Sequence, residues 1–170
     1  NVVLLPGPDV VPAITSGTID GTEWIGPAAD LGKGLHKVCS YYYYPGWHEP
    51  GTCLEAFINL QSWEKLSKSL QRLVETSCAK SNSYIASEFF ARNCFAVKKL
   101  REEFKVTFMR YNDLTLKVLK KRSDDVISQI ASKDNLSKKI FDNIIAFRKL
   151  AIFWSHYSEA DYLNARILSD

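Results

Sequence analysis

The sequence lacks several signatures that mark particular classes of protein. Its four cysteines, at positions 39, 53, 78 and 94, include no C-x-x-C pair, so nothing indicates a zinc ribbon or a thiol-redox site. No run of about 18 apolar residues occurs, because polar residues interrupt the most apolar stretch, 140–154, and a membrane-spanning helix is not expected. We expect most of the cysteines to be buried as small apolar side chains.

Motifs of common enzyme families are also absent. The sequence contains no G-x-S-x-G elbow, no P-loop and no H-E-x-x-H, and its three histidines fall on separate predicted elements. No nucleophile and base can therefore be placed together, and we expect a protein that is not an enzyme. The basic run 120–122 is followed at once by two aspartates, which favours a solvated helix face over a nucleic-acid partner.

Glycine and proline are absent after Gly51, and basic residues are scarce before residue 65. Residues 1–64 contain two basic and seven acidic side chains, whereas the remainder contains twenty basic and twelve acidic ones. Hydrophobic residues make up 46% and charged residues 24% of the chain, as in an ordinary globular domain. We therefore expect one compact unit, with an α/β part over residues 1–61 and a predominantly helical part over 62–170.

Apolar periodicity and turn-forming residues predict the individual elements. Strands are expected at 1–5, 22–25, 40–44, 53–59 and 106–111. Helices are expected between Asp9 and Gly17, and over 28–39, 62–104, 113–131, 134–155 and a short stretch after Ser158. The residues expected to cap these helices are Asp9, Ser62, Asn112 or Asp113, Asp134 or Asn135, and a capping box formed by Ser158 and Asp161.

Two clusters combine carboxylates with aromatic rings. Glu23 and Trp24 stand together in residues 20–27, and four tyrosines lead to Trp47, His48 and Glu49 in residues 41–51. Aromatic side chains around one or two carboxylates suit a small polar ligand or a hard cation bound by oxygen. The alternative is that the tyrosines belong to a strand core and that the acids are ordinary surface residues. From the residues alone, both interpretations remain open.

The same segments resemble a known family. GTIDGTEWIGP at 17–27, YYYYPGWHEPG at 41–51, FIN at 57–59 and the stretch 158–166 are similar to the extracytoplasmic solute receptors of TRAP (tripartite ATP-independent periplasmic) transporters. The likeness is to the DctP-like branch that binds α-keto acids, and to the C-terminal half only. It implies the C-terminal half of a type II periplasmic-binding-protein-like fold, in a periplasmic receptor that works with membrane permease subunits.

The resemblance also implies roles for particular residues. Trp24, Glu23, Tyr43 and Glu49 would contact a small organic acid, and Glu23 and Trp24 would help to hold a sodium or calcium ion that bridges to the ligand carboxylate. The arginine that pairs with the carboxylate in this family would lie upstream of Asn1. Because the chain starts without Met or a signal peptide, we expect a processed or trimmed chain or a fragment.

The resemblance also implies a dimer, because some keto-acid receptors of this family exchange a C-terminal helix between subunits. The helix expected at 134–155 is apolar on more than one side, which such an exchange would need. We therefore expect a homodimer through this helix. Two functions remain open: a truncated solute receptor that binds a 2-oxo acid, or a dimeric structural and interaction module that has lost solute binding.

Overall fold

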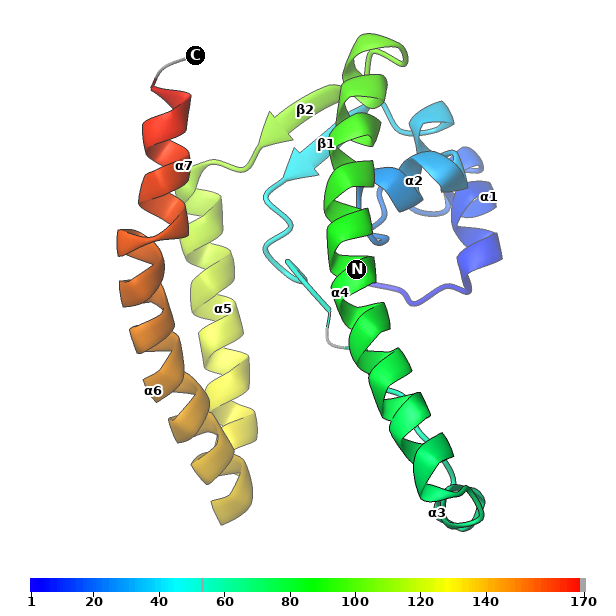
Figure 1. The fold of residues 1–170 in the computed structure, drawn as a ribbon. Coiled ribbons are helices and arrows are strands. Elements are labelled where there is room, and N and C mark those ends of the chain that lie inside the picture. The colour runs from blue at the N-terminus through cyan, green and yellow to red at the C-terminus, as the bar shows by residue number, and fades with distance from the viewer. Residues whose placement is uncertain (53, 169–170) are drawn as a thin grey trace. The chain divides into compact units, whose positions relative to one another are not determined.

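The computed structural model describes residues 1–52 and 54–168. It divides the chain into two compact units, Asn1–Tyr111 and Asn112–Asp170 (Figure 1). The change in composition near residue 61 lies inside the first unit, because the long helix that follows it packs against the N-terminal part of the chain.

The first unit contains short helices, two strands and one long helix. In chain order these are η1 (Gly7–Asp9), α1 (Val10–Thr15), α2 (Pro27–Lys33), η2 (Leu35–Lys37), β1 (Tyr41–Tyr44), α3 (Leu60–Glu64), α4 (Lys68–Glu102) and β2 (Thr107–Arg110). Helix α2 packs on α4, and the side chains buried in this unit include Val10, Leu35, Ala96, Leu100 and Val106.

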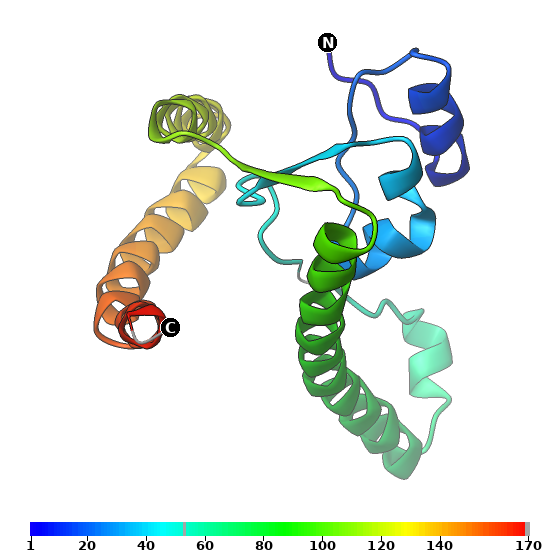
Figure 2. The same cartoon turned by 90° about the horizontal axis from the view of Figure 1, so that it is seen from above.

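The strands β1 and β2 lie side by side and run parallel (Figure 1, Figure 2). Tyr42 pairs with Phe108, and their rings stack with centroids 4.9 Å apart. Parallel neighbours need a long connection, which α4 supplies between the two strands. The strands expected at 40–44 and 106–111 are therefore confirmed.

The other three expected strands are not formed by the described residues. Residues 1–5, 22–25 and 54–59 have no strand partner in the described parts of the chain, and Cys53 lies outside them. A strand is stable only when a neighbour satisfies its backbone N–H and C=O groups. The β-forming residues are present, but the described parts of the chain place no further strand beside them.

The helix expected at 62–104 is interrupted near its start. Asn59 caps α3 by accepting from the Ser62 N–H at 3.1 Å, and Ser67 caps α4 by accepting from the Leu70 N–H at 3.3 Å. Ser62 is therefore not the cap that we expected, because it lies inside the short helix α3. The break follows from two capping residues eight positions apart.

The second unit consists of three helices, α5 (Asp113–Ala131), α6 (Asn135–Tyr157) and α7 (Glu159–Ile167). Asn112 and Asp134 cap α5 and α6 as expected, each accepting from a backbone N–H at 2.8 Å. The capping box at Ser158 is wrong, because its hydroxyl donates back to the Trp154 carbonyl instead of accepting from α7. No residue of α6 is buried.

Two further expectations, one about membrane-spanning helices and one about the burial of cysteines, have different outcomes. None of the described helices is long and apolar enough to cross a membrane, as expected. Cys39 is partly buried, but Cys78 and Cys94 are exposed thiols on α4. The expectation that the cysteines are mostly buried is therefore wrong for Cys78 and Cys94, and Cys53 lies outside the described residues. The periodic apolar stripe of α4 is only partly covered by α2, which leaves other faces of this helix open.

Candidate functional site

Trp24 lies in the loop that joins α1 to α2, and it is held in place by one neighbour in η1 and one in α2. A Cβ atom added to Gly7 would lie 2.9 Å from Trp24 Cη2, so the indole packs directly on the glycine backbone. Lys33 Nζ lies 4.2 Å from the centre of the indole ring on its face, in a cation–π contact. The half-buried ring is therefore fixed rather than projecting freely into solvent.

Glu23 joins the two sequence clusters. Its Oε1 lies 3.7 Å from His48 Nε2, with the side chains of Glu23 and His48 52% and 41% exposed. The His48 ring also meets the Trp47 ring edge-on, at 5.8 Å between centroids. The structure thus brings Glu23 from residues 20–27 next to the histidine that immediately precedes Glu49. We call Glu23, Trp24, His48 and Glu49 the Glu23 site.

The other two predicted residues, Glu49 and Tyr43, both belong to the second sequence cluster, residues 41–51, but they make different contacts. Glu49 accepts a hydrogen bond from Thr52 Oγ1 at 2.6 Å, which fixes its carboxylate within its own loop. Tyr43 is half-exposed near the end of β1 and stacks on Tyr111, with ring centroids 5.3 Å apart. None of the contacts found among the described residues joins Tyr43 to Glu23.

Sequence reasoning missed Asp30, which is only 8% exposed. Its Oδ1 accepts from the backbone N–H groups of Ile25 at 3.3 Å and Gly26 at 3.1 Å, and its Oδ2 accepts from the Tyr42 hydroxyl at 2.5 Å. Burial, and then the hydrogen bond to Asp30, raise the pKa of Tyr42 well above its usual range. The available signal was an acidic residue in the first turn of a short helix, four positions after Gly26.

The long helix α4 holds the same turn from the other side. Asn93 Oδ1 accepts from the Ala28 N–H at 2.9 Å. The Asn93 amide also lies within 4 Å of the position that a Cβ on Gly26 would take. Gly26 has φ +154°, a conformation that side chains disfavour, so the turn after Trp24 depends on glycine.

The oxygen ligands that the Glu23 site offers suit a hard cation, but they do not complete its coordination. Glu23 and Glu49 offer carboxylate oxygens, and Trp24 can offer only its backbone carbonyl, because an indole N–H is a donor. Calcium takes six to eight oxygen ligands. Within residues 1–52 and 54–168 no group of three or more His, Cys, Asp or Glu side chains is clustered for a metal, so a bound cation needs further ligands.

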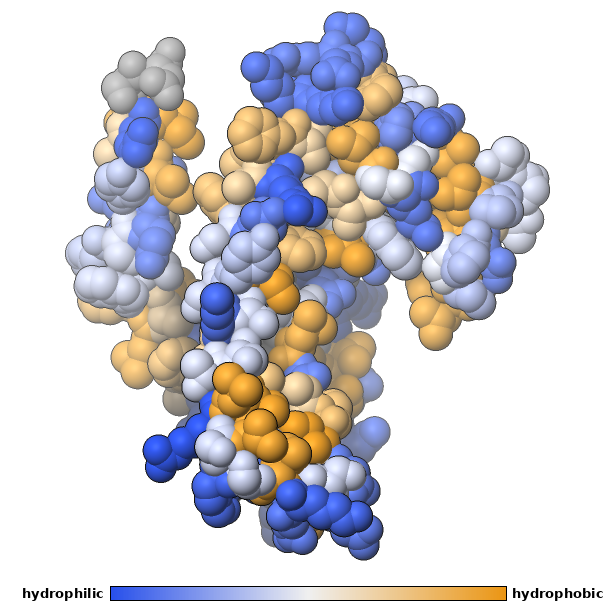
Figure 3. All heavy atoms as spheres, turned by 45° about the vertical axis from the view of Figure 1, so that its right-hand side comes forward, coloured by the Kyte–Doolittle hydropathy of each residue, from blue (hydrophilic) through white to orange (hydrophobic). Residues whose placement is uncertain are grey.

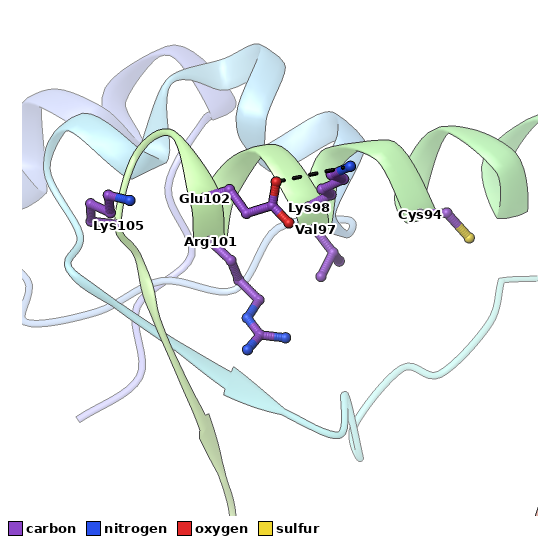
Figure 4. Close-up of a pocket in the computed structure, with 6 residues that line it drawn as sticks. All are labelled: Cys94, Val97, Lys98, Arg101, Glu102 and Lys105. Carbon is purple, nitrogen blue, oxygen red and sulfur yellow. Dashed lines mark ion pairs between the residues drawn. The ribbon is translucent and has the colours of Figure 1, made fainter. Parts of the chain in front are cut away.

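Two surface hollows lie elsewhere on the first unit. One, of about 510 Å³, is lined by α4 and by a residue three positions beyond its end: Cys94, Val97, Lys98, Arg101, Glu102 and Lys105 (Figure 4). The other, of about 520 Å³, lies where residues 56–63 approach the start of α4, in a region where apolar side chains gather (Figure 3). Neither hollow is lined by Glu23 or Trp24, so neither is formed at the Glu23 site.

Known proteins resemble this chain over most of its length. The model of the bacterial extracellular solute-binding proteins, family 7, matches residues 1–134. A monocarboxylate 2-oxoacid-binding periplasmic protein from Nostoc sp. is 34% identical over 164 residues, which are 96% of this chain and 45% of the relative.

A solved structure shares the fold. It is the crystal structure of a TRAP transporter solute-binding protein from Bordetella bronchiseptica, a mixed-occupancy dimer with copurified calcium and picolinate in one active site and an apo site. The TM-score is 0.90 at 28% identity, over 97% of this chain and 49% of that protein. The expected α/β fold, a partial periplasmic-binding-protein fold, is confirmed.

The chain spans about half the length of these relatives. The family match covers both clusters of the Glu23 site, and the resemblance drawn from the motifs is confirmed. The chain therefore belongs to family 7 of the bacterial extracellular solute-binding proteins, the solute receptors of TRAP transporters.

Proposed function

We propose that this chain forms one side of the ligand cleft of a TRAP receptor for a small organic carboxylate of the 2-oxo acid type. The observation that carries the proposal is the 3.7 Å approach of Glu23 to His48. Through this approach, two residues that lie more than twenty positions apart in the sequence bring their motifs together at one open, partly aromatic surface.

The acidity of the site requires a cation between protein and ligand. Glu23 and Glu49 would repel a carboxylate placed directly beside them. A calcium or sodium ion bound by the Glu23 carboxylate and the Trp24 carbonyl removes this repulsion and leaves coordination positions for the ligand. Glu49 and Tyr43 lie in the second motif, where they would contact the ligand or complete the cation's shell.

The ligands of the relatives share the chemistry that such a cation favours. The Nostoc protein is a 2-oxoacid-binding protein, and the Bordetella structure contains calcium with picolinate. A 2-oxo acid has a carbonyl oxygen next to its carboxylate, and picolinate has a ring nitrogen in the corresponding position. Both can therefore chelate one cation through two atoms, which supports a bridging cation and a 2-oxo acid here.

The wider context of the function is proposed by analogy with the family. We assign the ligand side to residues 1–61 and place the protein in the periplasm, where the Nostoc relative acts. There a receptor of this kind passes its ligand to membrane permease subunits. The chain would then bind and deliver its solute without catalysing a reaction.

Isothermal titration tests the proposal on two proteins. The first is the 170-residue chain, and the second is a hybrid in which this chain replaces the matched region of the Nostoc relative. With calcium or sodium present, pyruvate should bind the hybrid, and should bind the chain alone more weakly because one side of the cleft is missing. Glu23→Gln should lower the affinity by about tenfold or more, since a charged cation ligand is lost.

Glu55→Gln is the matched control, because Glu55 is an exposed acid in the loop before α3. It should leave pyruvate affinity unchanged. Equal affinity in wild type and the Glu23→Gln variant would contradict the proposed site. Absence of heat and of a thermal shift in both proteins, at millimolar 2-oxo acid, would refute solute binding.

A second function, a dimeric interaction module, is favoured by the surface of α6. Large apolar residues are exposed around this helix, namely Leu136, Ile140, Ile144, Phe147, Leu150, Ile152, Phe153, Trp154 and Tyr157. Soluble monomers rarely leave so much contiguous apolar surface uncovered. We propose that α6 contacts a second copy of the chain, in the receptor as well as in a module that has lost its ligand.

A further inference from the structure

The peptide group between Trp24 and Ile25 is oriented by a buried carboxylate. We propose that Asp30 is a positioning residue that aims the Trp24 carbonyl at the cation of the Glu23 site. This inference rests on the proposed function, because it assigns a role within the same site.

The contacts of Asp30 account for its burial. A carboxylate that is 8% exposed is costly unless its oxygens are hydrogen-bonded. Asp30 meets this condition with three donors: the N–H groups of Ile25 and Gly26 on Oδ1 and the Tyr42 hydroxyl on Oδ2. Both oxygens are engaged, so the side chain cannot rotate without leaving a donor unsatisfied.

The first of these bonds fixes the direction of the Trp24 carbonyl. A trans peptide is planar, and its N–H and C=O groups point in opposite directions. Because the Ile25 N–H points toward Asp30 at 3.3 Å, the Trp24 oxygen of the same peptide points away from Asp30. A cation ligand held in one orientation loses less conformational freedom on binding.

Further contacts stop the peptide from turning as the ligand binds. Asn93 on α4 accepts from the Ala28 N–H, which fastens the turn to the longest helix of the unit. The Tyr42 hydroxyl ties Asp30 to β1, and β1 leads directly into the loop of His48 and Glu49. One carboxylate is thus connected to both motifs of the Glu23 site.

Cation affinity measures this role separately from folding. Terbium is an oxygen-seeking stand-in for calcium, and energy transfer from tryptophan reports its arrival beside an indole. We would titrate terbium, and compete it with calcium, in the chain and in the Nostoc hybrid. Asp30→Asn should lower the affinity about 10–100-fold, the usual effect of losing a residue that orients a metal ligand, while circular dichroism at the assay temperature stays that of wild type.

Tyr42→Phe is the matched variant, because it removes one donor to Asp30 but keeps both backbone bonds. Its cation affinity should fall, but by less than that of Asp30→Asn, because the Trp24–Ile25 peptide keeps its bond to Asp30. Equal affinity in Asp30→Asn and wild type would overturn the positioning role. Wild-type protein that binds neither cation would instead refute the proposed function, so the two failures are distinguishable.

A measurement on the wild-type protein covers the case in which Asp30→Asn does not fold. Coordination of a carbonyl oxygen polarises its peptide and shifts the amide nitrogen of the next residue. Calcium should therefore shift the Ile25 ¹⁵N resonance while its N–H stays protected from exchange. A calcium-bound protein in which the Ile25 resonance does not move would overturn the proposal.

Discussion

His36 carries a buried ring nitrogen, Nδ1, that has no hydrogen-bond partner in the described parts of the chain. Its ring lies 4.1 Å from the ring of Phe104. Burial, and then the charges of Lys37 and Lys99, lower the pKa of His36 below its usual value. The folded chain therefore favours the neutral imidazole.

This residue should make stability depend on pH. The unfolded chain binds the His36 proton more readily, so the free energy of unfolding should fall as the pH drops through the usual histidine pKa of about 6.5 toward the lowered folded-state value. His36→Phe should flatten this part of the profile in urea unfolding between pH 8 and pH 5. His156→Gln, at an exposed histidine, should leave it unchanged, and an unaltered slope in His36→Phe would count against the account.

Residue types predict part of the candidate site, and contacts in the folded chain add Asp30 to it. Glu23, Trp24 and Glu49 stand out in the sequence because acids and aromatic rings adjoin one another in glycine-rich segments. Asp30 did not stand out, because its role comes from Tyr42 and from backbone groups that only the folded turn brings to it. The role of Asp30 therefore depends on tertiary contacts, which the sequence alone does not reveal.

At the scale of single elements, two glycines show how the sequence determines where α2, the helix that carries Asp30, ends. Gly34 follows the helix with φ +83°, the left-handed conformation that favours glycine. Gly32 lies inside the same helix, and a Cβ added there would have no heavy atom within 4 Å. The backbone at Gly34 therefore requires glycine, whereas the backbone at Gly32 can accept a residue with a Cβ.

Alanine substitution should separate these two glycines. Gly34→Ala should lower the free energy of unfolding by about 1 kcal/mol, because Cβ disfavours the left-handed conformation. Gly32→Ala should raise it by about 0.5–1 kcal/mol, because alanine is the better helix former. Both values come from urea unfolding of the single variants. Similar changes in the two variants would show that α2 does not end at Gly34 in solution.

Helices were predicted better than strands, for a physical reason. A helix cap acts within four residues, so Asn112 and Asp134 predict the starts of α5 and α6 from the local sequence alone. Strands depend on a distant neighbour, and the β-forming segments 1–5 and 22–25 have none among the described residues. The sequence pattern indicates a propensity for strands, and only a partner converts it into a sheet.

At the scale of the whole molecule, the uncovered surface of α6 predicts self-association. Phe147 is 70% exposed in the middle of this helix, among other large apolar residues. Phe147→Glu should convert the dimer to a monomer in size-exclusion chromatography with light scattering, because it places a charge in the apolar contact. Lys149→Glu introduces an acid on the opposite side of α6, since two residues span about 200° of an α-helix, and it should leave the dimer intact. A monomeric wild-type chain would contradict this prediction.

The family was predictable from short motifs, whereas the state of the cleft was not. GTIDGTEWIGP and YYYYPGWHEPG are local in sequence, so they indicate the family even in a chain that spans about half the length of its relatives. In the proposed function a ligand pocket has surfaces on both sides, and this chain would supply the side that carries Glu23.

The central claim is that Glu23 and the Trp24 carbonyl hold a cation that bridges to a carboxylate. A crystal structure of the Nostoc hybrid, grown with calcium and pyruvate, tests it most directly. We predict calcium at about 2.3–2.6 Å from a Glu23 carboxylate oxygen and from the Trp24 carbonyl oxygen, with the pyruvate carboxylate on the same ion. Calcium and pyruvate bound elsewhere, with the Glu23 carboxylate directed into solvent, would contradict the account.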